Sequence, residues 1–196
     1  RRSWQQRNRI KAAAGELMLT VPVLKRGRRD QPINLVEIDP GGHFAEKHIA
    51  AISTNYSKAP FFDAFAPQLF EILRRGHSRL CELTTELIEW LMKCIGSTTP
   101  VHRSSMMDVS GQKDELLLSI CSALEAGTYL SAPASRGYLE ESQCFPRSDV
   151  NIAYHQYAHP VYPQLHGSFL PYMSAIDPLF NMGDDARDML MSGVSA

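Results

Sequence analysis

The sequence has no long uninterrupted apolar segment. Its 196 residues contain no run close to the roughly 20 apolar residues that a membrane-spanning helix needs, because even Leu116 to Leu124 lies between Glu115 and Glu125. Cysteine is scarce, and its four copies form no CxxC pair: Cys81, Cys94, Cys121 and Cys144. Several of them fall in apolar helical patterns, which predicts buried thiols and a reducing, cytoplasmic setting without a membrane span.

Recognisable metal and nucleic-acid motifs are also missing. The spacing of His155, His159 and His166 fits no helical ligand pair, and no carboxylate or thiol completes a set, so the sequence predicts no metal site. No zinc finger, helix-turn-helix pattern or aromatic stacking platform accompanies the basic residues. We therefore expect a small-molecule substrate and no nucleic acid as partner, whereas the oligomeric state is not predicted.

The basic residues are concentrated at the start of the chain. Residues 1–29 hold nine Lys or Arg and one acidic residue, against eleven and twenty in the remainder, although the formal net charge is only -1. The first cluster, Arg1 to Lys11, is predicted to bind an anionic small-molecule group, and the second, Lys25 to Arg29, to be a solvated hairpin tip. Because residues 1–11 show neither an initiator Met nor a signal peptide, they resemble the interior of a longer protein.

Hydrophobic patterns predict the elements of the first half. Leu17 to Leu24 and Ile33 to Asp39 are short apolar or alternating runs around a charged turn, which predicts two strands. From residue 44 to 96 the period becomes helical, with Ser78 as a possible N-cap and Gly96 as a stop, and at least three helices are expected.

The second half predicts an α/β arrangement. A weak strand over Val101 to Met107 precedes a helix over residues 110–126, after which Thr128 to Ser131 returns at once as a strand, as in a partly parallel sheet. Val150 to Tyr157 alternates like a further strand. The expected fold is one α/β domain over residues 1–196, with a mixed or partly parallel sheet flanked by helices and a helical insertion at about 44–96.

The last forty residues carry an aromatic, proline-rich loop and then a helix. The proline-rich loop, which contains Pro160, Pro163 and Pro171, also holds Tyr162 and Gln164. This composition suits a binding pocket but equally suits a segment that covers the edge of a sheet. Asp177 is predicted as the N-cap of the helix, with Pro178 at its first position. Asn181 lies one turn after Asp177, so the pair is able to hold a ligand amine or hydroxyl, unless Asp177 is only a cap.

Three further groups of residues are candidates for catalysis or substrate binding. Ser131 ends a strand but lacks the glycines of a nucleophile elbow, so a substrate hydrogen bond or a capping role is expected rather than covalent catalysis. His48 is a catalytic candidate, although a structural histidine is the commoner outcome. Arg7 and Arg9, with Asn8 between them and Trp4 nearby, offer guanidinium groups for a carboxylate or phosphate, against the alternative of solvated arginines at a chain end.

Five segments, in order, resemble the WbqC-like protein family: WQQRNRIK with LTVPV, KHIAAISTNYSKAPFF, YLSAPASRGYLEE, YAHPVYPQLHGSF and SAIDPLFNMGDDAR. The typical positions of that family fall on Trp4, Arg7, Asn8, Arg9, Thr20, Pro22, His48, Tyr56, Tyr129, Ser131, Tyr138, Tyr162, Gln164, Phe169, Ser174, Asp177, Asn181 and Gly183. This chain departs from the pattern at Gln6, Ala132 and Pro178. The resemblance also implies a first strand before residue 1, which we expect to be missing here.

The resemblance implies a bacterial protein of surface-polysaccharide (O-antigen) biosynthesis that transfers glycine or another aminoacyl or acyl group. It places substrate contacts at Arg7, Asn8, Arg9, Tyr129, Tyr138, Tyr162, Gln164 and Asn181, with Ser131, Asp177 and His48 as catalytic candidates. ATP is a possible cofactor, because the expected opening motif resembles a histidine-containing phosphate loop. The alternative is a non-catalytic binding or scaffold protein of the same pathway.

Overall fold

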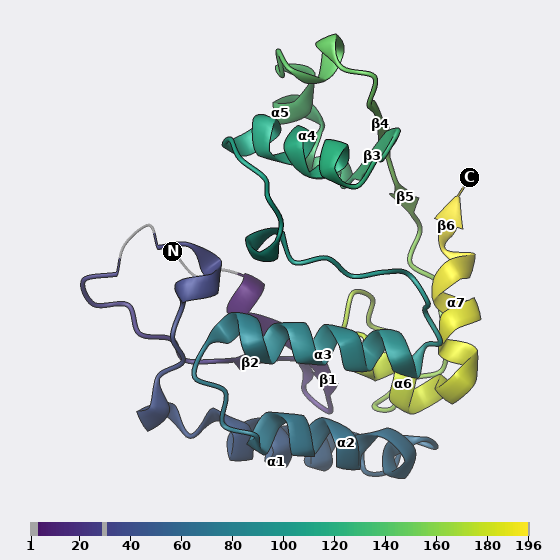
Figure 1. Ribbon diagram of the computed structural model, residues 1–196. Coiled ribbons are helices and arrows are strands. Elements are labelled where there is room, and N and C mark those ends of the chain that lie inside the picture. Colours follow the sequence, from purple (N-terminus) through teal and green to yellow (C-terminus); the bar gives the residue numbers. More distant parts are fainter. Residues whose placement is uncertain (1–3, 29–30, 196) are drawn as a thin grey trace. The chain divides into compact units, whose positions relative to one another are not determined.

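The computed structural model describes residues 4–28 and 31–195, shown as a ribbon in Figure 1. Its internal contacts divide the chain into two compact units. Unit 1 comprises Arg1–Thr98 and His159–Met191, and unit 2 comprises Thr99–Ala158 and Ser192–Ala196. Helices and strands occur together along the chain, which confirms the α/β class. A single domain spanning both units stays a prediction.

Unit 1 begins with an antiparallel hairpin. A short 3-10 helix, η1 (Trp4–Gln6), leads into β1 (Arg7–Ala12), which pairs with β2 (Gly15–Thr20) in a register that runs from Arg7 opposite Thr20 to Ala12 opposite Gly15. Gly15 has a φ of 108°, a backbone conformation that glycine adopts without strain, so the chain reverses within two residues. The basic segment from Arg7 to Lys11 is therefore a strand.

The predicted strand from Ile33 to Asp39 is wrong. Ile33–Leu35 forms the 3-10 helix η2, and η3 (Pro40–Gly42) follows it. Pro32 precedes η2 with a φ of -57°, a fixed angle that suits the start of a helical turn and not a regular strand. Only isolated bridges remain, between Val23 and Ile38 and between Glu37 and Arg79.

The helical segment at about 44–96 is confirmed. It contains α1 (Phe44–Tyr56), α2 (Phe62–Arg74) and α3 (Leu80–Cys94). At the start of α3 the N-cap is Arg79 rather than Ser78, and the Glu82 carboxyl accepts from the Arg79 backbone N–H at 3.1 Å and from the Ser78 hydroxyl at 3.3 Å. Gly96 follows α3 with a φ of 64°, as expected for a helix stop.

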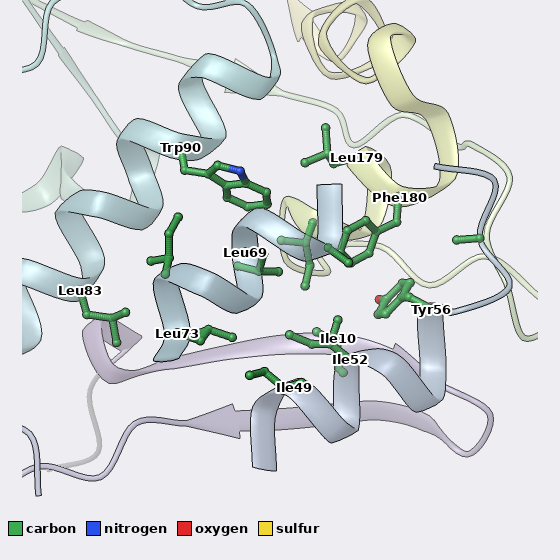
Figure 2. Packing of buried hydrophobic residues seen from close by; sticks show 14 of the residues in the cluster. Ile10, Ile49, Ile52, Tyr56, Leu69, Leu73, Leu83, Trp90, Leu179 and Phe180 are labelled. Carbon is green, nitrogen blue, oxygen red and sulfur yellow. The ribbon is translucent and has the colours of Figure 1, made fainter. Parts of the chain in front are cut away.

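The hydrophobic core of unit 1 lies where the hairpin and the helices meet. Figure 2 shows Ile10 of β1 near Ile52 and Tyr56 of α1, with Leu69 and Leu73 contributed by α2. The remaining labelled side chains come from α1, α3 and α6 (Ile176–Met182): Ile49, Leu83, Trp90, Leu179 and Phe180. The apolar stripes that predicted the helices are the faces that build this core.

The C-terminal part of unit 1 corrects one predicted cap. α6 has Ala175 at its N-cap, so Asp177 and Pro178 are its second and third residues. The Asp177 side chain does not cap the helix, because its oxygens accept hydrogen bonds from residues distant in the sequence. Met182 ends α6, and the turn η7 (Gly183–Asp185) leads into α7 (Ala186–Ser192).

Unit 2 contains the parallel pairing that the sequence predicted. β3 (Thr128–Ser131) runs parallel to β4 (Asn151–Tyr154), after α4 (Lys113–Ala123) and with α5 (Arg136–Glu140) between the two strands. The smaller elements are η4 (Ser104–Met106), η5 (Pro133–Ser135), η6 (Phe145–Arg147), and the antiparallel strands β5 (Gln156–Tyr157) and β6 (Val194–Ser195).

The expected strand over Val101 to Met107 is wrong, because Ser104–Met106 is a 3-10 turn and Met106 is highly exposed. No partner strand pairs with this segment in the part of the chain that the structure describes. The apolar residues of this segment do not pack against a buried surface. An alternating sequence forms a strand only where a neighbouring strand supplies hydrogen bonds and one face of the strand is buried.

Candidate functional site

The candidate residues fall into two groups, one in each unit. Unit 1 holds Arg7, Asn8, Arg9, His48, Tyr162, Gln164, Asp177 and Asn181. Unit 2 holds Tyr129, Ser131 and Tyr138.

Asp177 lies at the centre of a buried polar cluster in unit 1. Its side chain is 0% exposed, and Tyr56 of α1 donates its hydroxyl to Asp177 Oδ2 at 2.6 Å. Tyr162 donates its hydroxyl to Oδ1 at 2.8 Å, and Gln164 donates from Nε2 to the same oxygen at 2.9 Å. Asn181 Nδ2 donates to the Asp177 backbone carbonyl at 2.8 Å. The cluster therefore joins α1, the proline-rich loop and α6.

Tyr56 connects this cluster to the hairpin. The Lys11 backbone N–H donates to the Tyr56 hydroxyl oxygen at 2.9 Å, and that hydroxyl donates in turn to Asp177. Burial, together with the nearby Asp177 carboxyl, raises the pKa of Tyr56, so its hydroxyl keeps its proton and remains a donor. Tyr56 is a typical position of the family pattern, but sequence reasoning gave it no role, because Asp177 lies 121 residues away.

Lys11 is a second buried group that sequence reasoning missed. It counted only as one member of a basic cluster, yet its ammonium donates to the backbone carbonyl of Ser168 at 2.6 Å and of Gly167 at 3.4 Å. Burial lowers the pKa of Lys11, and the Asp177 carboxyl acts in the opposite direction. The Lys11 side chain therefore links β1 to the proline-rich loop by hydrogen bonds.

The Gln164 side chain forms most of its hydrogen bonds within its own loop. Its Oε1 accepts from the Leu170 backbone N–H at 2.9 Å, while Nε2 donates to the Leu170 carbonyl at 3.1 Å as well as to Asp177. In the same loop, His159 contacts Phe169 and Tyr172, with ring centroids 5.6 Å and 5.1 Å apart. The polar atoms of the Asp177 cluster are therefore used to fold the loop and to hold it in place.

A cavity of about 420 Å³ lies beside the core of unit 1. Side chains from the hairpin and from α1, α2 and α3 line it, and most of them are aliphatic: Leu19, Val21, Ile33, Ile52, Leu69, Leu73, Leu80, Leu83, Leu87, Ile88, Leu91 and Ile176. The polar or aromatic members are Gln5, Gln6, Arg7, Asn8, His48, Thr84, Trp90 and Ser174. Its size is in the range of small-molecule pockets.

Two donors in the cavity wall are unpaired. Arg7 Nε and Trp90 Nε1 are buried and have no hydrogen-bond partner within residues 4–28 and 31–195. Both nitrogens are donors only, and a buried donor without a partner costs about 1–3 kcal/mol. Both nitrogens are covered by neighbouring protein atoms, so neither presents its hydrogen to the cavity. Trp90 lies on the apolar stripe of α3 and belongs to the hydrophobic core, as that stripe predicts.

A second hollow, of about 380 Å³, adjoins the first. It is lined by Gln6, Arg7, Thr20, Pro22, Val23 and Lys25. Gln6 and Arg7 belong to both walls. Two cationic side chains and the Thr20 hydroxyl suit an anionic or hydroxyl-rich group, in contrast to the aliphatic cavity.

The other candidates of the hairpin and of α1 have partners within the chain. Arg9 Nη1 lies 3.0 Å from Glu16 Oε2, and its guanidinium carbon lies 5.1 Å from the centroid of the Trp4 ring. Asn8 Oδ1 accepts from the Arg9 backbone N–H at 2.8 Å. The His48 ring Nε2 lies 3.2 Å from the Thr20 carbonyl oxygen, and burial lowers the pKa of His48, with the Thr20 contact opposing that shift. Arg7 is thus the arginine that faces both hollows.

In unit 2 the candidates lie on β3 and α5. Ser131 is buried at the end of β3, and its carbonyl accepts from the His155 N–H at 3.1 Å. Ala132, where the family pattern has glycine, has a φ of -71°, the negative value expected for alanine. The Tyr129 ring packs on Phe145 with centroids 5.7 Å apart, and Tyr138 is partly exposed on α5.

The residues able to ligate a metal are dispersed over residues 4–28 and 31–195. No group of three or more His, Cys, Asp or Glu side chains gathers there in a way that would hold a metal ion. Across the same residues, every helix is too short or too polar to cross a bilayer.

Comparisons with known proteins place the chain in context. A family model described as the WbqC-like protein family matches residues 1–189. The uncharacterised protein Rv1507c of Mycobacterium tuberculosis is 34% identical over 192 residues, which is 97% of this chain and 82% of that relative. No solved structure matches. Because the family match begins at residue 1, it gives no support to the expectation that a first strand of the family is missing here.

Proposed function

Because this chain belongs to the WbqC-like protein family, we propose that it is a transferase of bacterial surface-polysaccharide (O-antigen) biosynthesis. It would join an activated acyl or aminoacyl group to a sugar or nucleotide sugar. The observation that supports this proposal best is that Arg7 lines two adjoining hollows of different chemistry. A transferase needs such a pair, since it must hold two substrates side by side in the geometry of reaction.

Each hollow suits one half of the reaction. The aliphatic cavity accommodates the transferred group, while Lys25 and Thr20 favour a phosphate-bearing partner in the second hollow. The Arg7 guanidinium carries several N–H donors in one plane, so it is suited to stabilise negative charge that develops on the acyl oxygen. ATP stays a possible co-substrate, because an adenylate is one route to an activated acyl group.

His48 is the candidate base of this proposal. It lines the aliphatic cavity, and the burial that lowers its pKa keeps the imidazole neutral at neutral pH. A neutral imidazole is able to take the proton that the acceptor hydroxyl or amine loses on attacking the acyl carbon. Asp177 and Ser131 remain further candidates, although Asp177 is surrounded by donors of its own chain.

The alternative is a non-catalytic binding protein of the same pathway. It is favoured by the Asp177 cluster, because the buried polar groups that resemble a catalytic centre are paired with one another. The two hollows would then hold a ligand without reaction. Under either function we propose a cytoplasmic location, in keeping with four cysteines that form no disulfide.

The test is a transfer assay on the purified full chain. Acyl and aminoacyl donors, or amino acids with ATP, are incubated with nucleotide sugars, and products are identified by mass spectrometry alongside phosphate and pyrophosphate release. We expect Arg7→Gln to lower kcat/KM about 10- to 100-fold, because a hydrogen bond to a charged group is lost. The matched control is Arg26→Gln, an exposed arginine that lines neither hollow.

Two results would contradict the proposal. If no donor and acceptor pair yields product while ligands still bind, the protein is a binding protein. If transfer occurs but Arg7→Gln and Arg26→Gln behave alike, the reaction takes place elsewhere in the chain.

A further inference from the structure

The His48 ring uses one of its two nitrogens to bind the hairpin. Its Nε2 lies 3.2 Å from the backbone carbonyl oxygen of Thr20, the last residue of β2. A carbonyl oxygen accepts hydrogen bonds and has no hydrogen to donate, so Nε2 is the atom that carries the hydrogen. Because the neutral imidazole is protonated at one nitrogen only, the lone pair of the neutral His48 ring is on Nδ1.

The pairing of the hairpin explains why the Thr20 carbonyl is available to His48. The Val21 N–H donates to the Gln6 carbonyl at 2.9 Å, which makes Gln6 and Val21 a hydrogen-bonded pair. Such pairs alternate with non-hydrogen-bonded pairs along an antiparallel ladder, so the next pair, Arg7 opposite Thr20, is of the second kind. The Thr20 carbonyl therefore points away from β1, and His48 supplies the donor that a buried carbonyl needs.

The second ring nitrogen of His48 remains open to a further partner. His48 is 9% exposed and lines the cavity of about 420 Å³. In the described part of the chain, Nδ1 has no hydrogen-bond partner, and the nitrogens that are both covered and unpaired are Arg7 Nε and Trp90 Nε1. His48 Nδ1 is thus unpaired and still accessible. The nitrogen with the lone pair is the one that a ligand in the cavity is able to reach.

Phe44 restricts the orientation of the His48 ring. It precedes His48 by one turn of α1, and the two rings meet edge to face, with centroids 5.3 Å apart and an interplanar angle of 71°. A half turn of the imidazole about χ2 would break the hydrogen bond to Thr20 and would displace the ring against Phe44. Phe44 itself packs against the hydrophobic core. It is therefore a positioning residue for His48.

We propose that Thr20 and Phe44 hold His48 as the Nε2–H tautomer, and that Nδ1 takes the proton of the acceptor. The proton transfer rests on the proposed transferase function, whereas the tautomer does not. In the reaction the acceptor oxygen or nitrogen bonds to the acyl carbon, and the bond from that carbon to the leaving group breaks with its electron pair going to the leaving group. The proton lost by the acceptor passes to Nδ1, and the imidazolium then returns it to the leaving group.

The tautomer is tested by nuclear magnetic resonance on the ¹⁵N-labelled full chain. Multiple-bond ¹H–¹⁵N spectra at about pH 8, above the ordinary histidine pKa of about 6.5, distinguish a protonated ring nitrogen from an unprotonated one by its ¹⁵N shift. The His48 signals are identified by their loss in His48→Gln and by nuclear Overhauser contacts to the Phe44 ring. A protonated Nε2 is expected. A protonated Nδ1, or two averaged shifts, would overturn the assignment.

His159 provides the opposite tautomer in the same spectrum. Its Nδ1 lies 2.9 Å from the Pro160 carbonyl oxygen, so the hydrogen is expected on Nδ1 and not on Nε2. The two histidines should therefore show reversed patterns. The same pattern in both would mean that the backbone carbonyls do not select the tautomer.

The role of Nδ1 is tested by two replacements of His48. Glutamine keeps an N–H donor for Thr20 but has no basic nitrogen, whereas asparagine is too short to reach that carbonyl. We expect His48→Gln to unfold in urea like the wild type at about pH 8, and to lower kcat about 100-fold or more with little change in KM, because a general base is lost. His48→Asn is expected to lose stability as well.

The matched control for these replacements is His102→Gln, at an exposed histidine of unit 2. A histidine with only a structural role would be rescued by glutamine. A kcat of His48→Gln within about threefold of the wild-type value would therefore refute Nδ1 as the proton acceptor.

The role of Phe44 is tested by a matched pair of phenylalanines. Phe44 and Phe70 are both partly buried against the core, but Phe70 contacts Phe62 and not His48 in the described ring contacts. Phe44→Leu is expected to move the two ¹⁵N shifts of His48 toward each other and to lower kcat about 3- to 10-fold, because the base is less well oriented. Phe70→Leu is expected to leave both unchanged, and equal effects would refute the positioning role.

The outcomes separate this inference from the proposed function. If His48 is the Nε2–H tautomer but no donor and acceptor pair yields product, the transferase proposal fails and the tautomer assignment stands. If transfer occurs while Nδ1 carries the hydrogen, the inference is refuted and the transferase proposal stands.

Discussion

Two buried regions of unit 1 differ in whether their polar groups have hydrogen-bond partners. In the Asp177 cluster, the carboxyl oxygens accept from Tyr56, Tyr162 and Gln164 at 2.6–2.9 Å, all from the same chain. In the aliphatic cavity, Arg7 Nε and Trp90 Nε1 are buried without a partner among the described residues. A paired cluster stabilises the fold, whereas a buried donor without a partner costs about 1–3 kcal/mol of stability.

This difference shows why residue type alone is a poor guide to a site. Tyrosines, a glutamine and an aspartate are the side chains expected of a catalytic centre, yet here they join α1, the proline-rich loop and α6. Tryptophan on an apolar helical stripe is expected to be core, and Trp90 is buried there, but its indole nitrogen has no partner among the described residues. The pairing of each polar atom decides between the two interpretations.

The largest expected effect comes from removing the centre of the paired cluster. Asp177→Ala leaves the hydroxyls of Tyr56 and Tyr162 without their acceptor, and each buried unpaired group costs about 1–3 kcal/mol. The Gln164 amide loses one acceptor but keeps the Leu170 carbonyl. We therefore expect the free energy of unfolding to fall by at least about 4 kcal/mol, measured by urea denaturation. A loss below about 1 kcal/mol would mean that the cluster is not structural.

A matched leucine pair compares packed core with cavity wall. Leu83 and Leu179 are both 0% exposed, but only Leu83 lines the cavity. Leu179→Ala and Leu83→Ala are each expected to cost about 3–5 kcal/mol, because both side chains are fully covered by neighbouring atoms and lose their contacts on truncation. A loss for Leu83→Ala that is smaller by about 2 kcal/mol or more in chemical denaturation would show that the cavity extends beneath this side chain.

The smallest expected effect is a pH dependence from His48. Burial lowers the pKa of His48 in the folded state, so below its ordinary value of about 6.5 the unfolded chain binds a proton that the folded chain does not. Stability is therefore expected to fall as the pH decreases through that value and to level off below the folded-state pKa. His48→Gln removes this contribution.

The measurement is the difference between wild type and His48→Gln in urea unfolding between pH 8 and pH 5, values that bracket the ordinary histidine pKa of about 6.5. Taking the difference cancels the carboxyl groups, such as Glu37 and Glu46, whose pKa values are lowered mainly by hydrogen bonds from Arg28 and Arg74. Parallel curves for the two proteins would show that His48 gains or loses no proton on folding. In that case its role as a neutral base loses its support.

Much of the secondary structure was predictable from the sequence. The helical period from residue 44 to 96 predicted α1 to α3, because one buried stripe per helix repeats every three or four residues. The strand over Thr128–Ser131 and the partly parallel character of the sheet were also predicted correctly, although the pairing partner β4 was not specified. The hairpin of β1 and β2 was not, because Arg7 to Lys11 has the composition of a solvated basic cluster, while Ile10 and Lys11 are both buried.

The sequence by itself determined the local elements and the family, since periodicity, turn residues and motif order are properties of short segments. Only the tertiary structure decided what the polar residues do. Tyr56 meets Asp177 across 121 positions, Lys11 reaches the backbone of residues 167 and 168, and Arg7 of β1 and Trp90 of α3 both line one cavity. Hydrogen bonding and burial depend on which residues are neighbours in space. Residues that are far apart in the sequence become neighbours only when the chain folds, so a short segment does not reveal them.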